Sequence, residues 1–372
     1  MNALIPPSEF FNLIRDKRRM IDVRSEIEFA EGHVPGSINI PILRTDERVL
    51  VGTCYKQYGR AAAIHLGETI VSGAKKSERI QNWIRAHRES NIGIITCFRG
   101  GLRSQFAQAW CEEAGVSLQR IEGGTKSLRT FLMQQLEVYC HKLPFLVIAG
   151  NTGCGKSSVL RDLTPYRLGL DLEALAHHRG SVFGGHLEPQ PSQISFENHI
   201  GCALIQLRNQ DMAADPSTGV LIEDESRTIG KCILPTPLFD KMRSSAAVIV
   251  DESLDVRTQN TFNEYVLGSR LRAGDIESGQ SVFRGFRDAV VKISRKLGGA
   301  RTSEVLDDLN QAEKCFETHQ DLEPNKVWIR KLLAWYYDPL YNDSFQRRNV
   351  RVVFRGSRQE VFDWGVLPAW HT

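Results

Sequence analysis

Apolar runs alternate with amphipathic stretches along the first part of the chain. The runs at residues 20–24 and 91–96 are short and apolar, which predicts two strands. Residues 61–88 and 102–115 repeat apolar positions at helical spacing, which predicts two helices. Because strands and helices alternate, we expect a small parallel α/β domain over residues 1–135.

A second series of apolar runs follows. The run at residues 145–150 leads into a glycine-rich turn and a helical pattern, and the runs at 220–226 and 247–253 each end in acidic residues. From about residue 260 the pattern becomes helical and basic. We therefore expect a second α/β domain over residues 136–372 with a helical, basic C-terminal part.

The glycine-rich turn carries a phosphate-binding pattern. Its residues fit G-x-x-x-x-G-K-[ST] between a strand and a helix, and they are Gly150, Asn151, Thr152, Gly153, Cys154, Gly155, Lys156 and Ser157. Glycines let backbone N–H groups surround a phosphate, and the positive end of the next helix faces the same anion. Lys156 adds a full charge, and Ser157 can bind Mg²⁺. The second domain is therefore predicted to be P-loop NTPase-like.

This motif predicts a phosphate ligand without specifying which one, so ATP or any diphosphate ester would fit. The chain lacks the NKxD pattern that reads guanine, which disfavours a GTPase. A Mg²⁺ on Ser157 needs an acid at the end of a neighbouring strand, and Asp224 and Asp251 are candidates. We assign Asp224, because residues 247–253 resemble a later strand.

The residues after the predicted strand at 91–96 suggest a second reactive site. Cys97 is followed by Gly100 and Gly101, which allow a tight loop, and by Arg99 and Arg103, which add positive charge. Loop amides and the positive end of the next helix favour the thiolate form, so we expect a reactive thiol open to its substrate. The alternative is a buried, inert cysteine, which the flanking arginines and glycines disfavour.

Composition limits the class of protein. The chain has 372 residues, of which 41% are hydrophobic and 24% charged, typical of a soluble globular protein with two domains. It lacks both a signal-peptide core and an apolar run of roughly 18 residues, so we expect a cytoplasmic protein without a membrane partner. The eight cysteines should then be reduced, and the role of Cys54 stays open. A net charge of +3 allows a nucleic-acid partner without requiring one.

The first domain resembles the rhodanese family. The resemblance rests on "DVRSEIEFAEGHVPGSINIP" at 22–41, "CFRGGLRS" at 97–104 and "EGG" at 122–124. In that family the active cysteine carries a sulfane sulfur or an analogous chalcogen. Five residues separate Cys97 from Arg103, one more than in ordinary sulfur carriers and similar to the rhodanese-fold phosphatases and arsenate reductases.

The whole chain resembles the tRNA 2-selenouridine synthase family. Segments of both halves carry the resemblance: "DERVLVGTCYKQYG", "GGTKSLR", "LAHHRGSVFGG", "SQISFEN", "EDESRTIG", "YYDPLY" and "VVFRG". One position departs from the family, because Thr125 stands where an aromatic residue is more typical. The resemblance implies a transferase that replaces the 2-thio sulfur of a wobble uridine in tRNA with selenium from selenophosphate. It also implies that the uridine is first S-geranylated with geranyl diphosphate.

The resemblance suggests roles for the two motifs. Residues 150–157, with Lys156 and Mg²⁺, would hold geranyl diphosphate, and Cys97 would carry selenium as a selenopersulfide. Arg99 and Arg103 would bind selenophosphate or stabilise the charged intermediate. A substrate loop would include His178, Arg179 and Gly180, and the partners would be tRNA and a selenophosphate-producing enzyme.

Other functions stay open. A sulfurtransferase, phosphatase or arsenate reductase of the rhodanese fold, fused to a P-loop kinase or NTPase, would share the same motifs. A non-catalytic RNA-binding protein is disfavoured by the intact Cys97, Lys156 and Ser157. Basic residues within 270–301 and 347–358 could follow RNA phosphates, or could belong to a solvated helix face and a charged edge strand.

Overall fold

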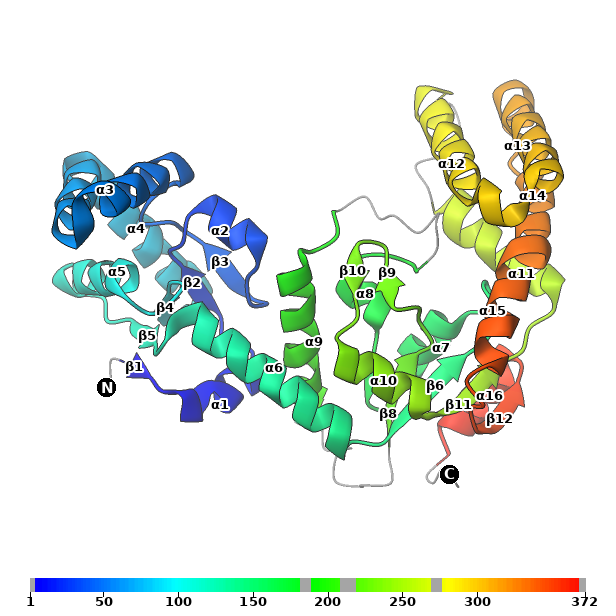
Figure 1. Cartoon of the computed structure of the whole chain (residues 1–372), viewed down its shortest axis with the longest axis horizontal. Coiled ribbons are helices and arrows are strands. Elements are labelled where there is room, and N and C mark those ends of the chain that lie inside the picture. Colours follow the sequence, from blue (N-terminus) through cyan, green and yellow to red (C-terminus); the bar gives the residue numbers. More distant parts are fainter. Residues whose placement is uncertain (1–3, 181–188, 208–218, 269–275, 368–372) are drawn as a thin grey trace. The chain divides into compact units, whose positions relative to one another are not determined.

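A computed structural model describes four stretches of the chain, which are residues 4–180, 189–207, 219–268 and 276–367. The chain folds as two compact units, one formed by residues 1–139 with 191–210 and the other by 140–190 with 211–372. Each unit contains a parallel sheet with helices around it (Figure 1), which confirms the predicted α/β fold class. Within the described residues, the helices include none that is both long and apolar enough to cross a membrane.

The first unit is built on a five-stranded parallel sheet. Its strand order is β1 (Leu4–Ile5), β5 (Gln119–Ile121), β4 (Ile94–Thr96), β2 (Met20–Asp22) and β3 (Ser37–Asn39). The central strands β2 and β4 are fully buried, as expected for a parallel sheet covered on both faces. The carboxyl end of β4 leads directly to Cys97.

Seven α-helices of the described residues belong to this unit: α1 (Phe10–Arg15), α2 (Glu26–Glu31), α3 (Thr45–Ile70), α4 (Gly73–Ser90), α5 (Leu102–Glu113), α6 (Gly124–Lys142) and α9 (Gln193–Leu207). The prediction of one helix over 61–88 was wrong, because α3 ends at Ile70 and α4 begins at Gly73. Gly73 has a φ of +52°, and this left-handed conformation interrupts the helical hydrogen bonds.

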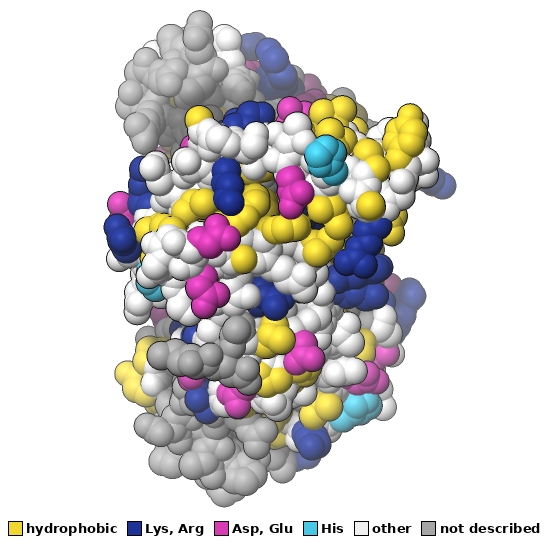
Figure 2. Space-filling view, turned by 90° about the vertical axis from the view of Figure 1, so that its left-hand side faces the viewer, with side chains coloured by type: hydrophobic (Ala, Val, Ile, Leu, Met, Phe, Trp, Pro, Cys, Tyr) yellow, Lys and Arg dark blue, Asp and Glu magenta, His cyan; other side chains and the backbone are white. Residues whose placement is uncertain are grey.

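Large hydrophobic side chains stay exposed on this unit, including Leu50, Tyr55, Tyr58 and Phe98. Figure 2 shows such side chains mixed with charged ones on one side of the molecule.

Helix α9 packs with the first unit although the predicted boundary at 135/136 assigned its sequence to the second domain. Gln206 of α9 donates to the Ile14 carbonyl at 3.2 Å, and Asn198 donates to the His33 carbonyl at 2.9 Å. A Cβ atom on Gly201 would lie 3.2 Å from Leu132, so glycine lets α9 approach α6 closely. The chain therefore returns to the first unit after the second has begun.

The second unit is also built on a five-stranded parallel sheet. Its order is β12 (Val352–Gly356), β11 (Ala246–Val250), β6 (Phe145–Ala149), β8 (Val220–Glu223) and β7 (Gly169–Leu170). Ile148 of β6 pairs with Glu223 of β8 and with Val248 of β11, so the carboxyl ends of these three strands lie level. Residues that follow these strands therefore meet at one edge of the sheet, where ligands bind in open α/β folds. The predicted basic edge strand is confirmed as β12.

Helices and a short hairpin complete the second unit. They are α7 (Lys156–Leu163), α8 (Leu172–Ala176), α10 (Thr236–Ser244), α11 (Leu254–Thr261), the π-helical η3 (Phe262–Leu267), α12 (Ile276–Leu297), α13 (Gly299–His319), α14 (Asn325–Leu332), the π-helical η4 (Leu333–Tyr337), α15 (Asp338–Gln346) and α16 (Arg358–Gly365), with the hairpin β9 (Thr228–Ile229) and β10 (Cys232–Ile233). The stretch after residue 260 is helical, as predicted. It has its own hydrophobic core, to which Phe283, Phe316 and Trp328 belong.

Candidate functional site

The glycine-rich turn forms a tight loop between β6 and α7. Gly150 and Gly153 have φ angles of +146° and +82°, which disfavour other residues. A Cβ atom would lie 2.4 Å from the Val250 carbonyl oxygen at Gly150 and 2.6 Å from the Arg257 carbonyl oxygen at Gly153. The loop therefore needs glycine both for its conformation and for its close approach to neighbouring backbone.

Lys156 begins α7 and lies against this loop. Its Nζ donates to the Gly150 carbonyl at 2.8 Å. Burial alone would lower the pKa of Lys156, but its electrostatic interactions with neighbouring acidic groups, with Cys154 and Glu225 foremost, raise it. Lys156 is therefore a permanent cation beside the loop amides.

A cavity of about 950 Å³ opens over this loop. It is lined by Thr152, Gly155, Lys156 and Ser157 and by side chains from the later helices. Six arginines also line it, which are Arg161, Arg179, Arg227, Arg243, Arg348 and Arg358. We call this space the P-loop cavity, and its size and charge suit a polyanionic ligand.

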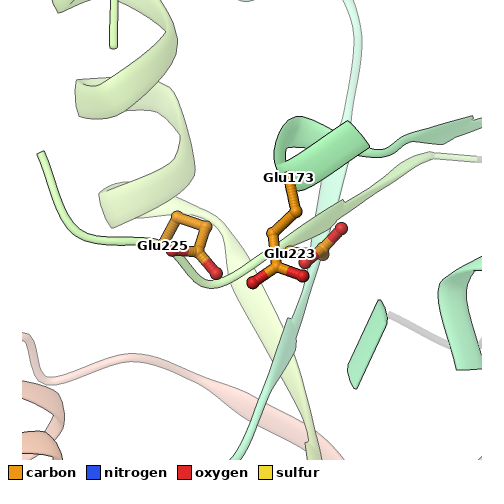
Figure 3. A group of neighbouring side chains, drawn as sticks. All are labelled: Glu173, Glu223 and Glu225. Carbon is orange, nitrogen blue, oxygen red and sulfur yellow. The ribbon is translucent and has the colours of Figure 1, made fainter. Parts of the chain in front are cut away.

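Three glutamates lie close to one another in the second unit (Figure 3). Two of them contact Ser157, whose Oγ lies 2.8 Å from Glu173 Oε2 and 2.9 Å from Glu223 Oε2. Glu173, Glu223 and Glu225 each offer a carboxylate oxygen, and these oxygens lie within 4.8 Å of one another. Glu223 is fully buried, and its Oε1 has no hydrogen-bond partner within the described chain.

The electrostatics of this cluster favour a cation. Burial raises the pKa of Glu173 and of Glu223, and burial with the nearby Glu173 charge raises that of Glu225 to about 8. Carboxylate and hydroxyl oxygens are the ligands that Mg²⁺ prefers, and a divalent cation would neutralise the repulsion between the carboxylates. The unpartnered Glu223 oxygen therefore fits a Mg²⁺ held by Ser157 and the three glutamates.

Asp224 occupies a different place from the one expected. Its Oδ1 forms an ion pair with Arg348, and its Oδ2 accepts a hydrogen bond from the Tyr341 hydroxyl at 2.8 Å. Its carboxylate is thus committed to these two groups, and the strand-end acid that reaches Ser157 is Glu223. The geometry favours Glu223 over Asp224 as the Mg²⁺ ligand.

The three glutamates were not predicted as ligands, and they differ in how far the sequence could have indicated them. Alternate side chains of an extended segment point the same way, so the spacing of Glu223 and Glu225 was a usable signal in "VLIEDES". Glu173 gave no such signal, because it reaches the site from α8. Asp171 caps that helix by accepting a hydrogen bond from the Ala174 amide at 2.8 Å. This cap sets the start of α8 and therefore the position of Glu173 in its first turn.

The predicted substrate loop is only partly described, since residues 181–188 lie outside the described residues. Arg179 and Gly180 line the P-loop cavity, whereas His178 is not among the lining residues. Arg179 donates to the Glu264 carbonyl at 2.7 Å, which ties it to η3. A Cβ atom on Gly180 would lie 2.8 Å from a Glu225 oxygen and 2.9 Å from a Glu173 oxygen. Gly180 therefore lets the backbone pass beside the glutamates.

Replacing Gly180 with alanine should weaken Mg²⁺ binding about tenfold. Its φ of +64° disfavours alanine, and the new methyl group would displace the carboxylates, which together cost on the order of 1–2 kcal/mol. Calorimetric titration of the full chain with MgCl₂ measures the change. Gly299→Ala is the control, because a Cβ there meets nothing within 4 Å. Equal Mg²⁺ affinity in both variants would contradict the placement of the ion.

The cysteine loop of the first unit is held from two sides. It begins after β4 and ends at Gly101, which caps the N-terminus of α5. The Thr125 amide donates to the Cys97 carbonyl at 3.0 Å, and the Lys126 amide donates to the Phe98 carbonyl at 2.9 Å. A Cβ atom on Gly124 would lie 2.1 Å from the Cys97 carbonyl oxygen. The start of α6 therefore fixes the shape of the loop.

Cys97 is less accessible than the sequence predicted. The residue is 3% exposed, and its thiol donates to Ser104 Oγ at 3.2 Å. The side chain turns under the loop toward α5, whereas Phe98 is 42% exposed and Arg99 is also exposed. A reactant must therefore enter the loop to meet the sulfur.

Arg103 is clamped by an acid that the sequence analysis missed. Its two Nη atoms lie 2.5 and 3.1 Å from the carboxylate oxygens of Glu28. Burial alone would raise the pKa of Glu28, but the Arg103 guanidinium beside it lowers that pKa to about 2. Arg103 thus anchors the loop to α2, whereas Arg99 has no acidic partner among the residues described. The separation of 75 residues between Glu28 and Arg103 left no local signal for their pairing.

Replacing Glu28 with glutamine should destabilise the first unit by roughly 2–3 kcal/mol at neutral pH. The pKa of Glu28 is about 2 in the folded chain against an ordinary 4.5, so its stabilisation is complete above pH 4.5. It is lost as the pH falls from 4.5 toward 2, and the difference between variant and wild type should vanish over that window. Hydrogen exchange of the β4 amides in the full chain measures it. Glu89→Gln, at an exposed position of α4, is the control, and a pH-independent difference would contradict the pairing.

Comparison with known proteins assigns both units. The family described as the tRNA 2-selenouridine synthase AAA domain matches residues 143–367, and the rhodanese-like domain matches residues 6–130. A protein named tRNA 2-selenouridine synthase from Nitrosomonas europaea is 42% identical over 364 residues, covering 93% of this chain and 94% of its own. One of the same name from Bdellovibrio bacteriovorus is 40% identical, with 96% and 97% covered. This chain belongs to the tRNA 2-selenouridine synthase family.

Membership of the tRNA 2-selenouridine synthase family confirms the resemblance seen in both halves of the sequence. The P-loop cavity lies in the part matched by the AAA domain, and the Cys97 loop lies in the rhodanese-like part. The other cysteines offer no comparable site among the described residues. Burial raises the pKa of Cys111 to about 11 and also raises that of Cys154, while Cys54 is half-buried on α3.

Proposed function

We propose that this protein is an enzyme that converts the 2-thio group of a wobble uridine in tRNA to a 2-seleno group. Selenophosphate supplies the selenium, and an S-geranyl intermediate is made first from geranyl diphosphate. The observation that carries the proposal is the near full-length match to relatives named tRNA 2-selenouridine synthase, in a chain that keeps both the P-loop cavity and the cysteine loop. The same match supports tRNA as the substrate.

The P-loop cavity suits the first step. The thiouridine sulfur attacks C1 of the geranyl group, the C–O bond to the diphosphate breaks, and pyrophosphate leaves. The amides of residues 150–155 and the Lys156 ammonium would bind the diphosphate and stabilise the charge that develops as it leaves. Ser157, Glu173, Glu223 and Glu225 would hold Mg²⁺, which offsets the charge of pyrophosphate when bound.

Alkylation prepares the second step. A thiocarbonyl sulfur is a poor leaving group, whereas an S-geranyl group leaves as geranylthiol. The selenium of selenophosphate attacks C2 of the base, the C–S bond breaks, and the thiol takes a proton. Transfer of the phosphoryl group from selenium, with water as its final acceptor, then gives 2-selenouridine and phosphate, so that atoms and electrons balance.

Electron balance changes the predicted role of Cys97. Selenium in selenophosphate is at the selenide level, and a selenopersulfide on Cys97 contains selenium two electrons more oxidised. Its formation from selenophosphate would release phosphite or require an oxidant. We therefore assign to Cys97 the phosphoryl group: its sulfur attacks phosphorus, the Se–P bond breaks, and water later releases phosphate. The five-residue spacing from Cys97 to Arg103 supports this role, because it resembles the loop of rhodanese-fold phosphatases.

Product analysis of the purified protein tests the proposal. The protein is incubated with 2-thiouridine tRNA, geranyl diphosphate and Mg²⁺, and selenophosphate is then added. Mass spectrometry of the digested nucleosides should show S-geranyl-2-thiouridine first and 2-selenouridine after the addition. Absence of both products would contradict the proposal, and hydrolysis of an aryl phosphate without tRNA would instead favour the phosphatase alternative.

A further inference from the structure

The P-loop cavity contains two arginines whose charge is not balanced by an acid. Four of its six arginines face carboxylates, in the pairs Arg161–Asp171, Arg179–Glu264, Arg348–Asp224 and Arg358–Asp162. Arg227 and Arg243 have no carboxylate within ion-pair distance in the part of the chain that the structure describes. These two are therefore the cavity arginines available to an anionic ligand.

An aromatic ring positions both side chains. The guanidinium carbons of Arg227 and Arg243 lie 5.0 Å and 5.7 Å from the centroid of the Phe239 ring. Arg227 also donates to the Thr236 hydroxyl at 2.7 Å. Stacking on an aromatic ring orders a guanidinium without neutralising it, so its remaining N–H groups stay free for a phosphate.

The surroundings of Arg243 add to this excess of positive charge. Burial lowers the pKa of Arg243 and the nearby Arg348 charge lowers it further, whereas the Asp224 carboxylate raises it and only partly offsets them. Arg348 itself is committed to Asp224. An anion beside Arg227 and Arg243 would relieve the repulsion between the guanidinium groups, whereas a neutral ligand would not.

We propose that Arg227 and Arg243 bind a backbone phosphate of the tRNA in the wall of the P-loop cavity. This inference rests on the proposed function, in which the wobble sulfur must reach C1 of the geranyl diphosphate held by residues 150–157. An RNA that brings its base into the cavity carries phosphates in with it, and planar guanidinium groups bind phosphate oxygens well. The loop amides, Lys156 and a Mg²⁺ held by the three glutamates would match the charge of the diphosphate.

Three arginines of the two basic stretches noted in the sequence are less suited to this task. Arg287 pairs with Glu313, Arg347 with Asp343 and Arg355 with Asp251, so these arginines already have partners. Surface ion pairs of this kind must break before the arginine can take a phosphate. The pair on Phe239 binds a phosphate without that cost.

Binding measurements on the full-length chain test the inference. The variants are Arg227→Gln, Arg243→Gln and the double variant, with Arg330→Gln as the control because Arg330 pairs with Asp255. Fluorescence anisotropy with labelled tRNA is measured from about 50 to 300 mM KCl, and calorimetry measures inorganic pyrophosphate binding. Each single variant should weaken tRNA binding about fivefold to tenfold and lower the slope of log K against log salt by about one half to one.

The outcomes separate this inference from the proposed function. Pyrophosphate affinity should stay within about twofold in all variants, and Arg330→Gln should match the wild type. Unchanged tRNA affinity in the double variant, or a loss confined to pyrophosphate, would overturn the inference. If the wild type itself failed to bind tRNA, the proposed function would fail instead. Lysine at both positions keeps the charge and should retain most of the salt slope, which distinguishes phosphate binding from misfolding.

Discussion

Replacing Lys156 with alanine should lower geranyl transfer to tRNA by at least about a thousandfold, or on the order of 4 kcal/mol in the barrier. Lys156 is the one full positive charge within residues 150–157, and its pKa is raised by the groups around it, which favours the protonated form. Without it, the loop amides alone face the departing pyrophosphate, and removal of a single preorganised donor commonly costs a hundredfold to a thousandfold. Formation of 2-selenouridine should fall equally, because it depends on the geranylated base.

Rates of S-geranyl product formation from 2-thiouridine tRNA measure this effect. Lys314→Ala, at an exposed position of α13, is the matched control and should leave the rate unchanged. Supplying tRNA that is already S-geranylated should restore selenium insertion to the Lys156→Ala protein. A variant that kept normal geranylation but lost selenium insertion would show that the P-loop cavity serves a different step.

Replacing Cys97 with serine should give the complementary result. Geranyl transfer should stay within about twofold of the wild type, and formation of 2-selenouridine should fall at least about a thousandfold. A serine hydroxyl in the same loop is a far weaker nucleophile than a thiolate, so it cannot accept the phosphoryl group at a useful rate. The readouts are release of inorganic phosphate and the nucleoside masses in a single reaction.

Two observations would separate this effect from a loss of folding. Cys54→Ser, at a half-buried cysteine of the same unit, should keep both activities. Wild-type protein quenched during turnover should carry a phosphoryl group on Cys97, gaining about the mass of one phosphate, and the serine variant should not. A selenium adduct on Cys97 in place of phosphate would restore the selenopersulfide role.

The parts of the site that are contiguous in sequence could be predicted, and the parts that meet across the fold could not. Residues 150–155 form one loop that leads directly into α7 at Lys156, so their spacing alone predicted a phosphate site. The strand at 220–226 was also found, but the choice of Asp224 ignored the alternation that points Glu223 and Glu225 together. The position of Glu173 depends on how α8 packs against the sheet, and no local sequence pattern predicts that packing.

The first unit shows the same division. The turn after the strand at 91–96 was readable because glycines and arginines surround Cys97 in sequence. The burial of that thiol against Ser104 and the ion pair between Arg103 and Glu28 both depend on tertiary packing. The same holds for helix α9. Its hydrophobic pattern predicts a buried helix but does not say which of the two units buries it.

The most direct test of the account uses cells that lack this protein. Their tRNA is analysed by mass spectrometry of wobble nucleosides after complementation with the wild type or with Cys97→Ser. The account predicts 2-selenouridine with the wild type, and S-geranyl-2-thiouridine or a selenophosphoryl nucleoside without 2-selenouridine with the variant. Normal amounts of 2-selenouridine in cells that carry only Cys97→Ser would contradict it.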